Sequence, residues 1–353
     1  MDSILNFSEE ELQKITIEGG FPSFRSKQLY SWLYDKSILD LELMSNLDRS
    51  YKSFISNQFK FKTIEIIKSI ASDDRQTIKL LLELCDKETV EIVIMRYPEK
   101  QTTKIRNTLC ISSQIGCQIA CPFCATGQSG FKRNLTTAEI LEQLFLANNY
   151  LRNTVNNSEK INNIVFMGMG EPFLNWEAVK NAATIMNTRF KIGERRITIS
   201  TSGVTKGIEA LADLGKQWVL AISLHGSNNQ LRDELVPINK KYPLEELIQS
   251  CRYYMNKANR RITFEYIMIH NKNIGLQNSR ELGLLLKGLK CHINGIPLNE
   301  TEEYPYKKPS KNEMNFFRTA VEKEGISFSI REEKGQSING ACGQLRNQRK
   351  GLL

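Results

Sequence analysis

The stretch Cys117-Gln-Ile-Ala-Cys121-Pro-Phe-Cys124 places three cysteines on one short loop, directly after the apolar residues 108–112. Thiolates at this spacing can hold three irons of a cubane cluster and leave the fourth iron without a protein ligand, unlike the usual four-cysteine ligation. A structural zinc ion would need four ligands, and all three histidines lie far along the chain. Three unrelated buried cysteines are a weak alternative, given this crowding. The loop therefore predicts an iron–sulfur site with one open metal position.

Downstream of this loop, strand patterns alternate with helical patterns six times. The expected strands cover residues 108–112, 163–168, 195–201, 218–224, 261–269, 291–299 and 326–331, and the expected helices cover 136–151, 176–186, 206–214, 244–257, 279–289 and 312–323. Repeated β-then-α units predict a parallel sheet with right-handed crossovers, whose chemistry lies at the carboxyl ends of the strands. Six units favour an α/β fold of the partial (β/α)6 barrel type. An open doubly wound sheet is the alternative that this pattern leaves open.

Upstream of residue 105 the pattern is different. Residues 1–60 predict a helical accessory module, with Ser8 and Glu11 at capping-box spacing and helices over 26–34 and 45–54. From residue 61 to 104 the apolar period changes to two, which predicts a small antiparallel β extension with turns at 72–74 and 86–87. The remaining 105–353 form the third expected domain, the α/β part of the chain.

Charge and composition bound the class of protein. The 353 residues carry a formal net charge of +9, with 41% hydrophobic and 25% charged residues, as in ordinary globular proteins. Residues 1–90 hold 12 basic and 15 acidic side chains, whereas the rest of the chain holds 36 and 24. The basic excess therefore lies in the α/β part, where it fits a polyanionic partner such as nucleic acid.

The cellular setting also follows from composition. The first residues lack the basic and apolar regions of a secretory signal, and no uncharged apolar run approaches the roughly 18 to 20 residues of a membrane helix. We therefore expect a cytoplasmic protein that does not enter the membrane. In that reducing compartment, clustered cysteines bind metal or do redox chemistry more often than they form structural disulfides.

With its flanks, the three-cysteine loop resembles the RlmN/Cfr family of radical S-adenosylmethionine (SAM) enzymes, which methylate adenine in RNA. The matching blocks are CISSQIGC at 110–117, CPFCATG at 121–127, GFKRNLTTAEI at 130–140, MGMGEP at 167–172, RRITISTSG at 195–203, AISLHGSN at 221–228, RDELVPINKKYPLEEL at 232–247 and ACGQL at 341–345. The resemblance covers nearly the whole chain. It implies a radical SAM partial barrel and a [4Fe-4S] cluster held by Cys117, Cys121 and Cys124.

The same resemblance implies a SAM site at the strand ends. Glycines in the MGMGEP loop let the backbone approach a ligand, and a glutamate there can accept from an amine or hydroxyl, although a tight turn would need the same residues. Polar residues at successive strand ends point to one pocket. The implied SAM contacts are Gly170, Glu171, Ser200, Ser223, Leu224, His225 and Asn299.

Three further residues take catalytic roles by resemblance. Cys342 has the small neighbours Gly340, Ala341 and Gly343, which permit an accessible thiol. The family implies that it carries the methyl group as S-methylcysteine, that two SAM molecules are used per turnover, and that the second yields a 5′-deoxyadenosyl radical. Cys110 is the implied resolving thiol, forming a transient disulfide with Cys342.

Glu91 is the implied proton acceptor. Burial in an apolar strand would raise the pKa of its carboxyl group, which suits a general base. From the residue pattern alone, Glu91 would be an outward-facing side chain on an alternating strand. Its catalytic role therefore comes from the resemblance.

The resemblance implies a methyltransferase acting at C2 of an adenine in the peptidyl-transferase centre of 23S rRNA and of an adenine next to the anticodon of some tRNAs. It further implies a monomer served by an electron donor such as flavodoxin or ferredoxin. Two alternatives stay open: Cfr-type methylation at C8 of the same rRNA adenine, which confers antibiotic resistance, and an iron–sulfur RNA-binding protein without catalysis. Residues 264–268, Ser202 and the NKKYPLEEL block are closer to the RlmN form.

Departures from the family pattern are few. Ser337, Asn339 and Gly340 stand near the C-terminus where aspartates and an alanine are usual, and Gly295 stands where a bulkier apolar residue is usual. The expected RNA-contacting clusters are Arg195-Arg196, Lys240-Lys241, Arg260-Arg261, Lys307-Lys308 and the basic tail 346–350.

Overall fold

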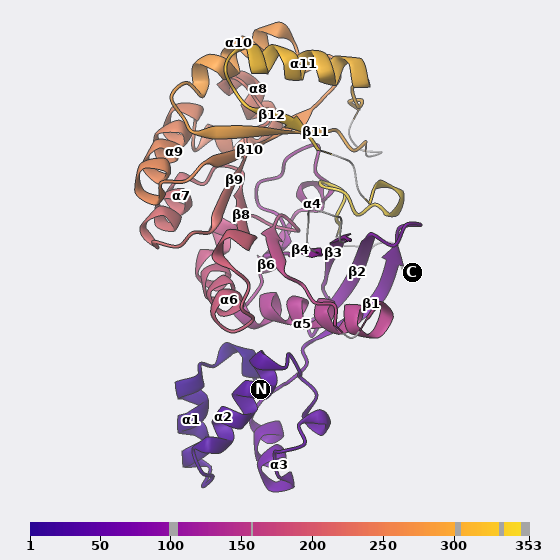
Figure 1. The fold of residues 1–353 in the computed structure, drawn as a ribbon, viewed down its shortest axis with the longest axis vertical. Coiled ribbons are helices and arrows are strands. Elements are labelled where there is room, and N and C mark those ends of the chain that lie inside the picture. The colour runs from indigo at the N-terminus through magenta and orange to yellow at the C-terminus, as the bar shows by residue number, and fades with distance from the viewer. Residues whose placement is uncertain (99–104, 157, 301–304, 332–334, 347–353) are drawn as a thin grey trace.

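The computed structural model describes residues 1–98, 105–156, 158–300, 305–331 and 335–346. A group of N-terminal helices lies at one end of the molecule, and a large α/β part with one continuous sheet makes up the rest (Figure 1). Within the described ranges, no helix has both the length and the apolarity needed to cross a membrane.

The N-terminal helices are α1 (Glu9–Glu18), α2 (Phe24–Tyr30) and α3 (Arg49–Gln58), with a π-helical turn at Ser31–Asp35 and short 3-10 turns at Ile4–Asn6 and Leu41–Leu43. The expected capping box is confirmed, since Ser8 Oγ accepts the Glu11 N–H and Glu11 Oε2 accepts the Ser8 N–H. Helix α3 begins four residues later than expected because Asp48 caps it, accepting the Tyr51 N–H at 2.8 Å.

The main sheet has ten strands whose spatial order follows the chain without reversal. Its strands are β1 (Ile64–Ala71), β2 (Thr77–Leu84), β3 (Thr89–Tyr97), β4 (Arg106–Cys110), β7 (Asn163–Phe166), β8 (Ile197–Thr201), β9 (Val219–Ser223), β10 (Ile262–Met268), β11 (Cys291–Pro297) and β12 (Phe328–Ile330). The pairs from β1 to β4 are antiparallel, and those from β4 to β12 are parallel. A doubly wound sheet reverses its order at a switch point, so that alternative is wrong and the partial barrel is confirmed.

Helices connect the successive parallel strands and cover the outside of the sheet (Figure 1). They are α5 (Thr137–Thr154), α6 (Trp176–Thr188), α7 (Thr205–Asp213), α8 (Asn229–Leu235), α9 (Leu244–Ala258), α10 (Leu276–Leu285) and α11 (Lys311–Lys323). Helix α10 lies about three residues before its expected position, because Asn278 accepts the Gly275 N–H and so starts the helix there. The chain then turns at Gly288, whose φ is +78°.

A second, two-stranded sheet is not predicted by the sequence pattern. It consists of β5 (Gln114–Gly116) and β6 (Phe131–Asn134), and it encloses the three-cysteine loop together with the short helix α4 (Ala125–Gln128). Gly116 is required here, because its φ is +73° and a Cβ would lie 1.8 Å from the carbonyl oxygen of Gly130. A strand of three or four residues carries too little periodicity to be detected in the sequence.

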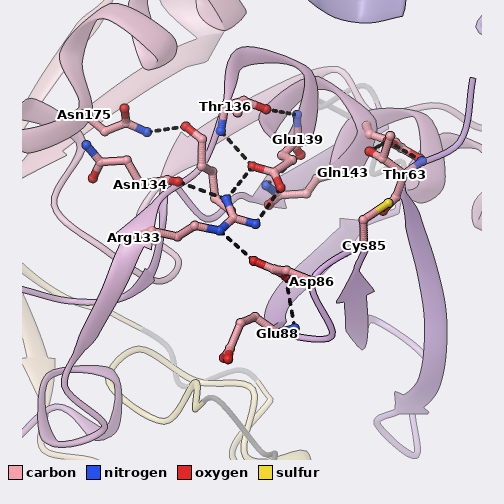
Figure 2. Close-up of polar contacts among 12 residues, drawn as sticks. Thr63, Cys85, Asp86, Glu88, Arg133, Asn134, Thr136, Glu139, Gln143 and Asn175 are labelled. Atoms are coloured by element: carbon pink, nitrogen blue, oxygen red, sulfur yellow. Dashed lines mark hydrogen bonds and ion pairs between the residues drawn. The ribbon is translucent and has the colours of Figure 1, made fainter. Parts of the chain in front are cut away.

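The base of this hairpin is tied to its surroundings by Arg133 (Figure 2). Its Nε donates to Asp86 Oδ2 in the β2–β3 turn at 2.8 Å, and its Nη2 lies 2.8 Å from Glu139 Oε1 in the first turn of α5. The guanidinium thus connects the hairpin, the antiparallel strands and the first crossover helix. We refer to residues 117–124 within the hairpin as the cluster loop.

Candidate active site

Two adjoining cavities open at the carboxyl ends of the parallel strands. The cluster cavity has Cys117 and Cys121 in its wall and contains about 920 Å³ of empty space. The β3 cavity has Cys110 in its wall and contains about 860 Å³. The residues that line both cavities include Cys124, Asn299, Arg331 and Cys342. A group on Cys342 can therefore face either cavity without leaving the site.

All three cysteines of the cluster loop line the cluster cavity, as expected. Burial raises the pKa of Cys117 to about 12, and burial likewise raises the pKa values of Cys121 and Cys124. Uncoordinated thiols in this loop would therefore stay protonated at neutral pH. Binding of iron must release those protons, so assembly of the site is coupled to pH.

The geometry of the cluster loop distinguishes between kinds of metal centre. In the described part of the chain, no three Cys, His, Asp or Glu side chains are grouped so as to hold a single metal ion. Zinc would need its sulfur ligands about 2.3 Å from one centre, whereas a cubane binds each thiolate to a different iron. Three thiols that line one cavity supply the three ligands of a cubane cluster, whereas a structural zinc ion would need a fourth ligand.

The MGMGEP loop forms one wall of the cluster cavity, between β7 and α6. Gly170 has a φ of +101°, and a Cβ there would lie 2.5 Å from the Cβ of Gln114, so only glycine fits. The buried carboxylate of Glu171 accepts from the N–H and Oγ of Ser202 at 2.7 and 2.6 Å. Burial raises the pKa of Glu171, and the two Ser202 contacts partly oppose that shift.

The expected SAM contacts come from several strand ends and largely meet in one place. Gly170, Glu171, Ser200, Ser223, His225 and Asn299 all line the cluster cavity. Leu224 is the exception among these described residues, since its side chain is fully buried in the main core. Its backbone still contributes to the site, because its N–H donates to the Glu265 carbonyl and its own carbonyl accepts from Arg232.

His225 is held as a neutral ring. Its Nδ1 accepts the Ile267 N–H at 3.0 Å, which leaves the ring proton on Nε2. Burial, aided by the nearby Arg232, lowers the pKa of His225 to about 3. The ring also packs edge-on against Phe123 of the cluster loop, with centroids 5.1 Å apart. His225 can therefore donate one hydrogen bond from Nε2 and carries no charge at neutral pH.

Cys342 lies on a loop of residues 339–346, which we call the Cys342 loop. The Cys342 thiol is exposed, and its carbonyl accepts from Nδ2 of Asn299 at 2.9 Å. The carbonyls of Gly343 and Leu345 accept from the Ala125 N–H and the Thr126 hydroxyl, each at 2.7 Å. The loop is thus docked on the segment that immediately follows the cluster loop.

Arg331 is a site residue that the sequence pattern does not reveal. It follows β12, lines both cavities, and its Nη1 lies 3.7 Å from Sγ of Cys342. The neighbouring thiols Cys342 and Cys110 and the carboxyl of Glu265 raise the pKa of Arg331, so its charge is retained despite burial. A cation beside a thiol stabilises the thiolate that acts as nucleophile. A clue in the sequence is an arginine at the end of the last parallel strand.

Glu265 and Ser202 are also absent from the expected set. Both are buried and line the cluster cavity. Burial raises the pKa of Glu265, although Arg331 and the amide of Asn294 favour its charged form. Their signal in the sequence is a polar residue in or directly after a largely apolar strand, since Glu265 lies in the middle of β10 and Ser202 follows β8.

Cys110 and Cys342 face the same β3 cavity, both as free thiols. Cys110 ends β4 and is buried, whereas Cys342 is exposed. Burial raises the pKa of Cys110 to about 12, and the neighbouring Cys342 adds to the shift. The tertiary structure therefore brings together two thiols that lie at opposite ends of the α/β part.

Glu91 is buried, with 1% of its surface exposed, so the outward-facing orientation expected from the residue pattern alone is wrong. Both faces of β3 are covered, which removes the alternation on which that expectation rested. Its Oε1 lies 3.0 Å from Nζ of Lys79, and its Oε2 accepts the Arg346 N–H at 2.9 Å. Among the described residues that line the two cavities, Glu91 is absent.

The basic clusters are divided between two ends of the sheet. Arg195-Arg196 and Arg260-Arg261 precede β8 and β10, so they lie at the amino ends of these parallel strands, away from the cavities. Lys240-Lys241 and Lys307-Lys308 lie in connections that leave the carboxyl ends of β9 and β11. Of the basic tail, residues 347–350 lie outside the described part of the chain.

Comparisons with known proteins agree with this geometry. A model of the radical SAM superfamily matches residues 111–277, and a model of the N-terminal domain of ribosomal RNA large subunit methyltransferases matches residues 3–60. A Clostridium botulinum protein named probable dual-specificity RNA methyltransferase RlmN is 40% identical over 98% of each chain. A protein of the same name from Petrotoga mobilis is 42% identical over 98% of this chain and 97% of its own.

The match extends to a solved structure. A radical SAM methyltransferase from Sphaerobacter thermophilus superposes with a TM-score of 0.93 at 37% identity, over 99% of this chain and 100% of that one. The radical SAM fold implies a [4Fe-4S] cluster and SAM as cofactors, and the donor set of the cluster loop fits that cluster. By its sequence over nearly its full length and by its structure, the chain belongs to the RlmN family of radical SAM methyltransferases.

Proposed function

We propose that this chain methylates C2 of an adenine in the peptidyl-transferase centre of 23S rRNA and of an adenine next to the anticodon of some tRNAs. The names of its relatives, which describe dual-specificity RNA methyltransferases, support the RNA substrates. The observation that carries the proposal is that Cys342 lies in the wall shared by the two cavities, with Cys117 and Cys121 on one side and Cys110 on the other.

Cys117, Cys121 and Cys124 would hold the [4Fe-4S] cluster, leaving one iron open to SAM. The bound cluster and SAM supply the one-electron chemistry that activates a C–H bond, with two SAM molecules used per turnover. Gly170 and the other strand-end residues would bind and orient SAM in the cluster cavity. Asn299 makes a direct link, because it lines this cavity while its amide holds the Cys342 carbonyl.

Cys342 would carry the methyl group. Its exposed thiol lies beside the Arg331 guanidinium and would attack the methyl of SAM. Two stages are chemically necessary, because an aromatic C–H carbon of adenine is not a nucleophile and cannot attack SAM directly. The chemistry that the cluster and SAM supply would remove one hydrogen atom from the methyl group on Cys342 Sγ, and its carbon would then bond to the base.

Cys110 and Glu91 would release the product. Glu91 would accept the proton from the attacked carbon, which suits a carboxyl group whose pKa burial raises above the usual 4.5. Cys110 Sγ would then attack Cys342 Sγ and form a disulfide as the carbon–sulfur bond breaks, and the released carbon would keep that electron pair and take up a proton to become the methyl group of the base. Their common cavity supports this pairing of the two thiols.

The substrate base must leave its stack to reach the cavities, as base-modifying enzymes generally require. Lys240-Lys241 and Lys307-Lys308 are the clusters whose position suits phosphate contacts around such a base. We further propose a cytoplasmic monomer that takes electrons from a donor such as flavodoxin or ferredoxin. The helical module, which matches a ribosomal RNA methyltransferase domain model, would contribute to holding RNA.

The test is nucleoside mass spectrometry of a 23S rRNA fragment after incubation with the reconstituted protein, SAM and a reductant. We expect 2-methyladenosine, and none with a Cys342→Ala protein. Formation of 8-methyladenosine without the 2-methyl product would overturn the proposed position and favour Cfr-type chemistry. An intact cluster that gives no methylated nucleoside would overturn the catalytic proposal and favour an RNA-binding protein.

A further inference from the structure

A buried ion pair lies on the antiparallel strands next to the β3 cavity. Lys79 of β2 and Glu91 of β3 have side-chain exposures of only 5% and 1%, and their charged atoms are 3.0 Å apart. In the β2–β3 register Lys79 pairs with Val93 and Glu91 pairs with Leu81, so the two side chains are diagonal neighbours on one face. Val93 on that same face lines the β3 cavity.

The two charged groups also bind the two ends of the Cys342 loop. Nζ of Lys79 donates to the carbonyl of Asn339 at 3.2 Å, where the loop begins. Oε2 of Glu91 accepts the N–H of Arg346 at 2.9 Å, where the loop ends. One ion pair therefore holds both ends of the segment that carries Cys342.

The loop depends on such outside contacts because it contains little regular structure. Residues 340–346 lie in neither a helix nor a strand, and Asn339 and Gly343 have φ values of +49° and +82°. Backbone groups without partners in a helix or sheet need others. Charged partners in a buried site make stronger hydrogen bonds than neutral ones. The ion pair thus supplies firm anchors for the loop ends, while Asn299, Ala125 and Thr126 hold its middle.

Both oxygens of the Glu91 carboxylate are already engaged by the protein itself. In this arrangement one carboxylate oxygen faces the Lys79 ammonium and the other accepts the Arg346 N–H. The carboxylate is also absent from the described lining of both cavities. Because the Arg346 N–H occupies Oε2, movement of this end of the loop would open a path from the cavity to that oxygen.

We propose that Lys79 is a positioning residue which, with Glu91, clasps the Cys342 loop in the closed arrangement, and that opening of this clasp at Arg346 frees the Glu91 carboxylate for its catalytic role. The proposal rests on the proposed function, in which Cys342 carries the methyl group. It separates methyl loading, which uses the closed loop, from product release, which uses the free carboxylate. A purely structural ion pair would instead stabilise β2 and β3 without a specific effect on the loop.

Hydrogen exchange measured by mass spectrometry tests the clasp without SAM or RNA. In anaerobically purified, cluster-containing protein, Lys79→Met is expected to speed amide exchange in residues 340–346 about tenfold, because the closed loop loses its charged anchor. Lys79→Arg, which keeps the charge and the donors, is expected to restore slow exchange. Lys68→Met is the matched control, since Lys68 is an exposed lysine on the neighbouring strand β1.

A second variant keeps the test usable if Lys79→Met leaves a buried carboxylate that prevents folding. The double variant Lys79→Met/Glu91→Gln removes both charges together, so no charge is left unpaired, and it is expected to show the same faster exchange in the loop. Slow alkylation of Cys251, a fully buried thiol on α9, reports that the α/β part remains folded.

A second readout follows the single-turnover rate of methyl transfer to Cys342, measured on the tryptic peptide. We expect Lys79→Met to lower this rate about tenfold at unchanged iron content, with recovery in Lys79→Arg. Unchanged exchange in residues 340–346, or an increase spread evenly over β2 and β3, would overturn the clasp. Absence of methyl from Cys342 in the unaltered protein would instead overturn the proposed function. The hydrogen-exchange measurement would still test the clasp, because it needs neither SAM nor RNA.

Discussion

The cluster loop and the Cys342 loop bring four cysteines to the same pair of cavities by different means. The three cysteines of the cluster loop are close neighbours in the sequence, and the hairpin of β5 and β6 encloses them. The Cys342 loop carries one cysteine, and its ends are bound to Lys79 and Glu91, 260 and 255 residues earlier in the chain. A local loop suits the proposed role of a fixed cluster site, whereas a loop held by a few distant hydrogen bonds suits the proposed role of a carrier between the two cavities.

The largest expected effect separates the two loops by their cofactor content. Cys121→Ala and Cys342→Ala should each reduce RNA methylation by at least about 10³-fold, because each removes a group on which the chemistry depends. Only Cys121→Ala should lose iron, as measured by anaerobic absorption spectra and iron analysis. Normal iron content in Cys121→Ala, or iron loss in Cys342→Ala, would contradict the proposal that Cys121 binds the cluster and that Cys342 does not.

Cys110→Ala should stop turnover after the carbon carried on Cys342 has bonded to the base. Without a thiol to form the disulfide with Cys342, the protein and RNA should remain covalently joined, at about one RNA per protein. Denaturing gels and intact mass spectrometry detect such an adduct. Cys251→Ala, at a buried thiol outside both cavities, is the control that should turn over normally. Release of methylated RNA by Cys110→Ala at the normal rate would contradict the resolving role.

A smaller effect is expected from pH, through Glu91. Burial outweighs the attraction of Lys79 and raises the pKa of Glu91 above 4.5. A proton acceptor must be ionised, so product release should slow on acidification through this raised pKa, at higher pH than for an ordinary glutamate. Glu91→Gln should lower the release rate and abolish that limb of the pH profile. If Glu91→Gln leaves the pH dependence of the release rate unchanged, another group accepts the substrate proton.

Glu91 should affect stability in the opposite direction: acidification slows product release but raises the contribution of Glu91 to the free energy of unfolding. Because the pKa of Glu91 is higher in the folded than in the unfolded chain, protonation of this group favours folding. This contribution to the free energy of unfolding is therefore fully present below the pKa of Glu91 in the unfolded chain. It is lost as pH rises through the pKa of Glu91 in the folded protein. Urea titrations of the unaltered protein and Glu91→Gln, compared between acidic and neutral pH, isolate this contribution.

The smallest expected effect concerns the base of the cluster loop. Arg133 contacts Asp86 and Glu139, but the arginine side chain is 34% exposed and the aspartate 42%, so water screens the pairs. Arg133→Ala should lower the free energy of unfolding by about 1 kcal/mol. Lys132→Ala, at the exposed neighbouring position, should change it less. Chemical denaturation measures both. Loss of several kcal/mol with loss of iron would show that the hairpin depends on Arg133 far more than its exposure indicates.

Much of the fold follows from local patterns. The six β-then-α units, the capping box at Ser8 and the turns around residues 72–74 and 86–87 depend on neighbours in the chain, and the structure contains all of them. The β5–β6 hairpin was missed because strands of three and four residues carry almost no periodic signal. Gly295 replaces the bulkier apolar residue that is usual in the family, and only the structure gives the reason. The ring of Phe328 lies within 2.6 Å of where a Cβ would stand.

The candidate site divides in the same way. The cysteines and most of the expected SAM contacts lie at predicted strand ends, and the topology of a parallel sheet brings such ends together. The sequence pattern does not reveal Arg331, Glu265 and Ser202, because a single polar residue in or beside a strand has no distinctive spacing. Lys79 gave no signal at all, since its partners at Glu91 and Asn339 come from two other segments.

By itself the sequence determined the cluster loop, the order of the β and α units and the family, because these depend on spacing between near neighbours. Only the tertiary structure decided the surroundings of Glu91 and Cys342. Whether Glu91 is exposed depends on what covers both faces of β3, and the loop that carries Cys342 is bound at both ends by an ion pair between two other strands. Burial and long-range hydrogen bonds are properties of packing, so no local pattern encodes them.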